Sequence, residues 1–157
     1  TTEIYTLSLH DALPILLNVF SYTGAFSVYA FAGGASSVLE IDLNPIALAA
    51  SRKNLRLHFT NRNFSVEEFS QMKIDGFDAL SKLESDSQRY DLVILDPPAF
   101  AKRKKQTKTA LNAYTKLAQA GAKVTKKGGI LFAASCSVHV QTTNFYKAVF
   151  EIGRAHV

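Results

Sequence analysis

The feature that most constrains the fold is an alternation of short apolar runs with segments of helical periodicity. Five apolar runs are typical of buried strands, and a helical segment follows each of them. The predicted strands are residues 16–21, 36–42, 69–75, 90–96 and 129–136. The predicted helices are residues 25–34, 45–58, 76–84, 108–127 and 142–151. Strands that alternate with helices indicate βαβ units and a parallel sheet.

This pattern predicts an α/β fold of the Rossmann-like, doubly wound type, with a mostly parallel sheet. Ligands of such sheets bind beyond the carboxyl ends of the strands. Three of the predicted strands end at Asp42, Asp75 and Asp96, and the last ends at Cys136. An acid there often only caps the next helix, and a lone cysteine is often a small buried apolar residue. Four such residues on one rim nevertheless indicate a binding site.

The composition is that of one soluble globular domain. The chain has 157 residues, of which 47% are hydrophobic and 20% charged. No run approaches the ~18 apolar residues of a membrane span. The single cysteine excludes an internal disulfide and suits a reducing compartment, so we expect a cytoplasmic protein. A net charge of +5 permits a polyanionic partner without requiring one.

The two ends of the sequence differ from the rest. The stretches YTLSLHDALPI (5–15) and IGRAHV (152–157) look like translated sequencing-adapter DNA. The first lacks the basic start and the small-residue cleavage site of a signal peptide. We expect residues 1–15 and 152–157 to be non-native tails, and residues 16–151 to be the part that carries the function. A native but irregular tail is the alternative.

The turn after the first strand argues against a dinucleotide. A dinucleotide site has a GxGxxG pattern there, whereas this turn offers only Gly24, so NAD is disfavoured. Asp42 follows Gly24 at about the ~20 residues expected of an acid that accepts hydrogen bonds from ribose hydroxyls. Asp75 is a candidate acceptor for an adenine amino group. Ribose and adenine without phosphates indicate S-adenosylmethionine.

The stretch YDLVILDPPAF (90–100) ends a strand on an acid, two prolines and an aromatic residue. A residue before proline is kept out of the helical region, and proline has a fixed φ and no N–H to satisfy. The loop therefore holds Asp96 and its neighbouring carbonyls at a set position, where they can accept hydrogen bonds from the amino group of an extruded base. Phe100 is a candidate for stacking on that base. The alternative is a tight turn with Phe100 in the core.

A basic run, KRKKQTK (102–108), follows directly. Charge runs are usually solvated faces, but the position beside a predicted base pocket favours phosphate contacts. The candidate phosphate-binding residues are Lys102, Arg103, Lys104 and Lys105.

Four motifs together resemble one family. They are FSYTGAFSVYA (20–30), LDPPAFAK (95–102), ALNAYTKL (110–117) and KKGGILFAASCS (126–137). In combination they resemble the class I rRNA methyltransferases, above all the bacterial large-subunit rRNA cytosine-5 methyltransferase I group. The resemblance runs through residues 16–151. It implies a class I methyltransferase domain that is partial here, truncated before the final strand pair and without the family's N-terminal RNA-binding domains.

The resemblance also implies the partners and the site. S-adenosylmethionine is the expected cofactor and rRNA the expected substrate, with no metal and no membrane. The implied cofactor-binding residues are Phe20, Tyr22, Thr23, Gly24, Asp42, Asp75, Gly76 and Asp96. Pro97, Pro98 and Phe100 are the implied base-binding residues, beside the four basic candidates named above.

Cys136 is the candidate nucleophile, with Asp96 as the second catalytic residue. Cytosine C5 is a weak nucleophile, and thiolate addition at C6 activates it, which is the kind of covalent catalysis that suits cysteine. We expect Ser135, Ser137 and the start of the following helix to stabilise the thiolate. His139 is a weaker candidate, since a lone histidine near a helix start is more often structural.

The leading hypothesis is methyl transfer from S-adenosylmethionine to C5 of a cytosine in large-subunit rRNA. One alternative is methylation of an amino nitrogen of RNA, in which the Asp-Pro-Pro loop holds the amine and Cys136 is structural. Another is a non-catalytic RNA-binding module. A nicotinamide oxidoreductase is disfavoured by the missing glycines.

Overall fold

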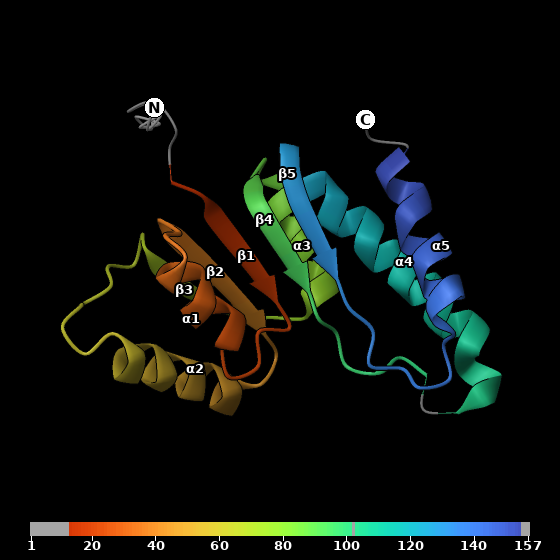
Figure 1. The fold of residues 1–157 in the computed structure, drawn as a ribbon, viewed down its shortest axis with the longest axis horizontal. Helices are drawn as coiled ribbons and strands as arrows, with labels where there is room; N and C mark the ends of the chain where they lie inside the picture. The colour runs from red at the N-terminus through yellow and green to blue at the C-terminus, as the bar shows by residue number, and fades with distance from the viewer. Residues whose placement is uncertain (1–12, 102, 155–157) are drawn as a thin grey trace, which may run out of the picture.

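The structure is a computed structural model that describes residues 13–101 and 103–154. Its strands form one sheet in the order β3-β2-β1-β4-β5, and every neighbouring pair is parallel (Figure 1). The strands are β1 (Ile15–Val19), β2 (Ser37–Asp42), β3 (Phe69–Lys73), β4 (Tyr90–Leu95) and β5 (Thr125–Ala133). The predicted Rossmann-like α/β fold is confirmed.

Helices cover both faces of the sheet. They are α1 (Ala25–Ala32), α2 (Pro45–His58), α3 (Gly76–Ser85), α4 (Thr107–Val124) and α5 (Thr142–Arg154), with a short 3-10 helix η1 (Lys104–Gln106) before α4. In Figure 1, α1 and α2 lie on one face, α3 and α4 lie on the other, and α5 packs on α4. No helix among the described residues is both long enough and apolar enough to cross a membrane.

The central strand β1 shows why the sheet is covered on both sides. Leu17 and Val19 pack with the α3 and α4 residues of the larger core cluster. Leu16 points the other way, into a cluster that includes Phe31 of α1 and Leu55 of α2. Both faces of a parallel strand are buried, so its sequence reads as a continuous apolar run.

The local start signal of α2 behaves as its sequence predicts. Asn44 is the N-cap, and its Oδ1 accepts hydrogen bonds from the backbone N–H groups of Ile46 (3.0 Å) and Ala47 (3.4 Å). Pro45 occupies the first helical position, where a missing N–H costs nothing. The cap fixes where the helix leaves the end of β2.

Gly128 and Gly129 do not end the long helix as predicted. The helix α4 ends at Val124 and β5 begins at Thr125, so both glycines lie inside the strand. The β4–β5 register shifts here, and Gly128 has a φ of 78°. A Cβ on Gly129 would lie 2.9 Å from the carbonyl oxygen of Asp91. The pair thus serves an irregularity in the strand.

The predicted tails, residues 1–15 and 152–157, fall largely outside the described residues. Within the described part, Ile15 is the first residue of β1, and its N–H donates to Asp91 Oδ2 at 2.8 Å. The helix α5 continues to Arg154. Regular structure therefore extends slightly beyond residues 16–151, and the adapter origin of the tails stays a prediction.

Gly24 and Gly34 form a matched pair for testing the packing beneath the β1–α1 turn. Both have positive φ, 78° and 95°. A Cβ on Gly24 would collide with Ser51 Oγ and lie 2.6 Å from Glu40 Oε1, whereas nothing lies within 4 Å of a Cβ on Gly34. We expect Gly34→Ala to lower the free energy of unfolding by about 1–2 kcal/mol, from backbone strain alone. Gly24→Ala should lower it by about 2–5 kcal/mol, because overpacking adds to strain.

Urea denaturation of the two variants and the parent chain measures this difference. Equal losses at the two glycines would contradict the packing described here.

Candidate active site

A cleft of about 490 Å³ lies at the carboxyl ends of the strands. The segments that follow all five strands contribute to it, as expected for an open parallel sheet. Its lining consists of Phe20, Tyr22, Asp42, Leu43, Asn44, Ile74, Asp75, Gly76, Asp96, Pro97, Pro98 and Cys136. The structure thus brings together the four residues that the strand ends single out: Asp42, Asp75, Asp96 and Cys136. Their roles in binding and catalysis stay predictions.

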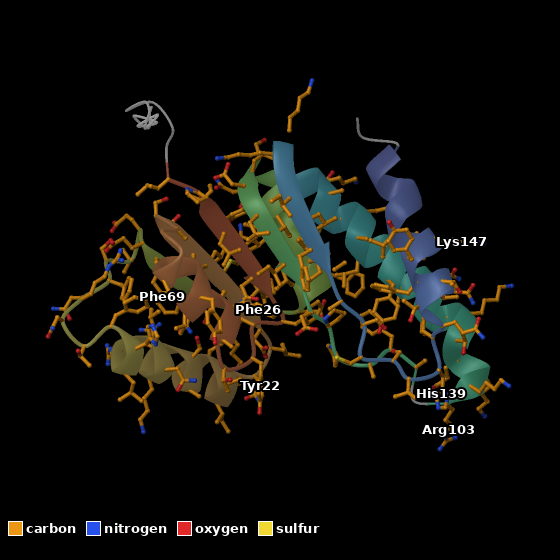
Figure 2. The ribbon with its side chains drawn as sticks, in the orientation of Figure 1. Tyr22, Phe26, Phe69, Arg103, His139 and Lys147 are labelled. Carbon is orange, nitrogen blue, oxygen red and sulfur yellow. The ribbon has the colours of Figure 1, made fainter. Side chains whose placement is uncertain are left out.

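The loop after β1 forms one wall of the cleft. Phe20 and Tyr22 have φ values of 62° and 47°, a left-handed conformation that is costly for residues other than glycine. Backbone hydrogen bonds hold it, since Ser21 N donates to Ile41 O (3.0 Å) and Tyr22 N donates to Asp42 Oδ2 (2.8 Å). Tyr22 is exposed near the middle of the rim (Figure 2). The loop is therefore fixed against the end of β2.

Asp42 and Asp75 both make local hydrogen bonds and retain further acceptor capacity. Asp42 Oδ1 accepts from Asn44 N at 2.8 Å, while its Oδ2 accepts from Tyr22 N. Asp75 caps α3, because its Oδ1 accepts from Phe77 N at 2.8 Å. Its Oδ2 has no hydrogen-bond partner among the described residues. A carboxylate offers about four lone-pair sites. The hydrogen bonds named here therefore do not exclude ligand binding by either residue.

The Asp-Pro-Pro segment is not helical, as its sequence predicts. Residues 96–99 adopt neither helix nor strand, Pro97 is buried, and Pro98 is exposed. Asp96 N donates to Val19 O at 3.4 Å, which keeps the segment beside the end of β1. The half-buried Asp96 carboxylate makes no hydrogen bond to any described residue. An acceptor without a partner therefore faces the cleft.

Cys136 is a free, exposed thiol in the loop after β5. This loop continues the pairing of β5, since Ala134 N donates to Leu95 O at 2.9 Å. Cys136 therefore lines the same cleft as Asp96 rather than packing among aliphatic side chains.

The neighbours expected to stabilise a Cys136 thiolate take part in other hydrogen bonds, and their role toward the thiolate stays a prediction. The buried Ser137 hydroxyl lies 2.8 Å from the Tyr114 hydroxyl and accepts from Ala101 N at 3.1 Å. Ser135 Oγ accepts from Ser137 N at 3.3 Å. The helix α5 begins only at Thr142, well past the cysteine. The hydrogen bond from Ala101 N to Ser137 Oγ joins the Cys136 loop to the segment after Asp-Pro-Pro. It therefore connects the two loops that carry the catalytic candidates.

Phe100 occupies the position of the alternative interpretation. Its ring centroid lies 4.8 Å from that of Tyr114 and 6.2 Å from that of Phe77, and the side chain packs against two core clusters. It does not line the cleft. Phe100 therefore packs in the core next to the Asp-Pro-Pro segment. Its stacking on a base stays a prediction.

Thr23 and Gly24, two cofactor-binding candidates in the turn after β1, also lie outside the cleft lining. The carbonyl oxygen of Thr23 accepts from Asn54 Nδ2 at 3.0 Å. Gly24 lies against Ser51 and Glu40, so its missing side chain serves packing below the turn. Gly76 does line the cleft, and a Cβ there would meet the ring of Phe20.

The basic candidates and His139 lie toward the α4 end of the rim. Arg103, Lys104 and Lys105 are exposed there, around η1, and Lys102 lies outside the described residues. His139 is exposed, and its carbonyl oxygen accepts from Thr107 Oγ1 at 3.3 Å. Figure 2 shows His139 and Arg103 well to the side of Tyr22. His139 does not line the cleft.

Sequence reasoning missed three residues of the lining, Leu43, Asn44 and Ile74. Each is adjacent in sequence to Asp42 or Asp75 or follows one residue later, so their places next to strand-end acids were the available signal. Leu43 and Ile74 make the cleft partly apolar. Apolar side chains beside carboxylates suit a nucleoside, whose ring packs against apolar surface and whose hydroxyl and amino groups donate. Among residues 13–101 and 103–154, no group of three or more His, Cys, Asp or Glu side chains is placed to hold a metal.

Comparison with known proteins shows the family of the chain. Residues 10–145 match the family model described as S-adenosylmethionine-dependent methyltransferase. A relative from Deinococcus radiodurans named "Ribosomal RNA large subunit methyltransferase" is 40% identical over 88% of this chain and 33% of its own length. "Ribosomal RNA large subunit methyltransferase I" of Aeromonas salmonicida is 33% identical over 91% of this chain and 35% of its own length. The chain therefore spans about a third of these relatives.

Solved structures agree with the sequence comparison. A methyltransferase complexed with S-adenosylhomocysteine (SAH) superposes with a TM-score of 0.73 and 29% identity, over 88% of this chain and 35% of that one. A methyltransferase from Streptococcus mutans also gives a TM-score of 0.73, at 27% identity, over 90% and 35% of the two chains. With the family model matching most of its length, the chain belongs to the S-adenosylmethionine-dependent methyltransferase family.

Proposed function

We propose that this chain is part of an enzyme that methylates C5 of a cytosine in large-subunit rRNA. The observation that supports the proposal is one cleft lined by Asp42 and Asp75, which follow β2 and β3, and by Asp96 and Cys136, which follow β4 and β5. The names of the relatives support rRNA as the substrate. The covalent cysteine chemistry is the finer part of the proposal and has its own test below.

The adenosine end of the cleft is formed by the segments after β1, β2 and β3. Asp42 accepts from the ribose hydroxyls, and the unused Oδ2 of Asp75 accepts from the adenine amino group. Gly76 lets the Phe20 ring pack against the start of α3, since a Cβ would lie 2.5 Å from that ring. These residues bind the nucleoside and direct its sulfur end toward β4 and β5.

The reaction occurs at the other end of the cleft. The Cys136 thiolate adds to C6 of cytosine, and the electron pair of the C5–C6 double bond makes C5 nucleophilic. S-adenosylmethionine supplies an electrophilic methyl group, which C5 takes up as the carbon–sulfur bond of the sulfonium breaks. A base then removes the C5 proton, and the electrons of that C–H bond restore the double bond and expel the Cys136 sulfur.

Asp96 orients the base in this scheme. Its carboxylate has no partner among the described residues and stands on a stiff segment, so it accepts a hydrogen bond from the cytosine amino group. The same contact would serve methylation of an amino nitrogen, in which Cys136 takes no covalent part. The two chemistries differ in whether a protein–RNA bond forms.

The variant Asp42→Asn tests the cofactor end. We expect its affinity for SAH to fall by about 1.5–3 kcal/mol, on the order of 10–100-fold in Kd, because hydrogen bonds to a charged acceptor are replaced by weaker ones. Isothermal titration calorimetry of the chain with SAH measures the loss.

Asp78→Asn is the matched control for Asp42→Asn. Asp78 is an exposed acid in the first turn of α3 and does not line the cleft. Its SAH affinity should equal that of the parent chain. Unchanged binding by Asp42→Asn, with an unchanged thermal midpoint, would remove Asp42 from the cofactor site.

The variant Cys136→Ala tests the covalent step. With S-adenosylmethionine and a large-subunit rRNA transcript carrying 5-fluorocytosine, the parent chain should form a protein–RNA adduct, because fluorine at C5 cannot leave as a proton does. The Cys136→Ala chain should form none. Denaturing gel electrophoresis with labelled RNA detects the adduct.

Val138→Ala is the control, because it changes an exposed side chain of the same loop outside the cleft lining and keeps the thiol. Methylated RNA without any adduct in the parent chain would refute C5 chemistry. Nuclease digestion and mass spectrometry would then locate the methyl group, and an N-methylated base would establish the alternative.

A further inference from the structure

A groove separate from the cleft runs between α2, the edge strand β3 and the loop that joins them. It consists of two adjoining hollows of about 370 and 350 Å³, which share Arg52, Arg56 and Gln71. The other lining residues of the first hollow belong to α2. Those of the second include Arg62, Phe64 and further residues between 62 and 70. Nothing in the cleft described above requires this groove.

The α2 wall of the groove carries uncompensated positive charge. Arg52, Lys53 and Arg56 are exposed, and α2 contains no acidic residue. Every ion pair found among the described residues lies elsewhere, so none of these three side chains is paired with a carboxylate. Arg52 and Arg56 are four residues apart and therefore share one face of the helix. This face attracts anions.

Arg52 is held in place without losing its charge. Its Nε and Nη2 donate to Gln71 Oε1 at 3.3 and 2.8 Å, and an amide oxygen is a neutral acceptor. Gln71 is itself anchored, because its Nε2 donates to the buried Glu40 Oε2 and to Leu48 O, each at 2.8 Å. The guanidinium is thus positioned before any ligand arrives, and its remaining N–H donors are available.

Arg62, on the opposite wall, provides the contrast. It pairs with Glu68 at 2.7 Å and lies 4.4 Å from the centroid of the Phe64 ring. Hydrogen bonds from the Ser65 N–H and from Arg62 hold the pKa of Glu68 below its usual value, so this pair persists at neutral pH. Arg62 therefore forms a wall of the groove, and the free charge is concentrated on α2.

We propose that this groove binds the phosphate backbone of the RNA substrate, through Arg52 and Arg56 with help from Lys53. The inference rests on the proposed function for its choice of polyanion. Helix α2 begins at the cleft, where Asn44 is part of the lining, and rises ~1.5 Å per residue toward the two arginines. The basic residues around η1 lie at the opposite end of the rim (Figure 2). Positive charge therefore flanks the cleft on both sides.

The double variant Arg52→Gln/Arg56→Gln tests the groove. Fluorescence anisotropy with a fluorescein-labelled single-stranded RNA of about 20 nucleotides gives affinity across a salt series. The plot of log affinity against log salt has a negative slope. For two lost phosphate contacts, this slope should become less steep by about 1.4. Affinity should fall at every salt concentration, while calorimetry with SAH gives the Kd of the parent chain.

Lys82→Gln/Lys123→Gln is the matched control. It removes two positive charges from α3 and α4, where each lysine is already paired with a carboxylate, so its salt slope should equal that of the parent chain. Lys53→Gln/Arg56→Gln removes no hydrogen bond found among the described residues, and it gives the same readout should loss of the Arg52–Gln71 contact unfold the chain.

The outcomes separate this inference from the proposed function. An unchanged slope and affinity in both groove variants, with RNA binding by the parent chain intact, would overturn the groove and leave the methyl-transfer proposal standing. An equal fall in the lysine control would also overturn it, because net charge alone would then account for the effect. Failure of the parent chain to bind RNA while it binds SAH would overturn the groove alone, because the methyl-transfer proposal concerns a longer enzyme of which this chain is a part.

Discussion

The parallel register of β1 with its two neighbours is the constraint on which the rest of the structure depends. Val19 pairs with Ile41 of β2 on one side and with Leu95 of β4 on the other. The residues that follow these three, Phe20, Asp42 and Asp96, therefore leave the sheet at one level. Because the carboxyl ends of parallel strands lie at the same edge of the sheet, the crossover connections between the strands bring residues far apart in the sequence to one cleft. Burial of apolar side chains fixes the register of the strands, and this register determines which residues meet at the cleft.

Hydrogen bonds between loops then fix what the register has brought together. Asp42 accepts from Tyr22 N, which joins the β1 and β2 loops, while Ser137 accepts from Ala101 N, which joins those of β4 and β5. Each pair combines a residue of one loop with the backbone of another, so neither loop can move alone. Such preorganisation lowers the ordering cost of binding. It also explains why residues outside the cleft lining, such as Ser137, matter for the site.

The sequence was most informative where structure depends on neighbours in the chain. The end of β2 at Asp42, and the Asn44 cap before Pro45, are local features and were predicted. The strands β3 and β4 end at Lys73 and Leu95, shortly before the acids at which they were predicted to end. Gly128 and Gly129 were mistaken for a helix stop because their role depends on Asp91 in a different strand. The contacts of Phe100 and Ser137 with Tyr114 on α4 were not predicted, for the same reason. The cleft as a whole could be predicted, but which neighbours support it could not.

In the proposed function, each end of the cleft binds a distinct partner: a nucleoside at Asp42 and Asp75, and a reacting base between Asp96 and Cys136. A crystal structure of the chain with bound SAH tests this division directly. We predict the adenosine between the loops after β2 and β3, with the sulfur atom directed toward the Asp96 and Cys136 loops. Ligand density elsewhere on the molecule, or a sulfur atom pointing away from both of those residues, would contradict it.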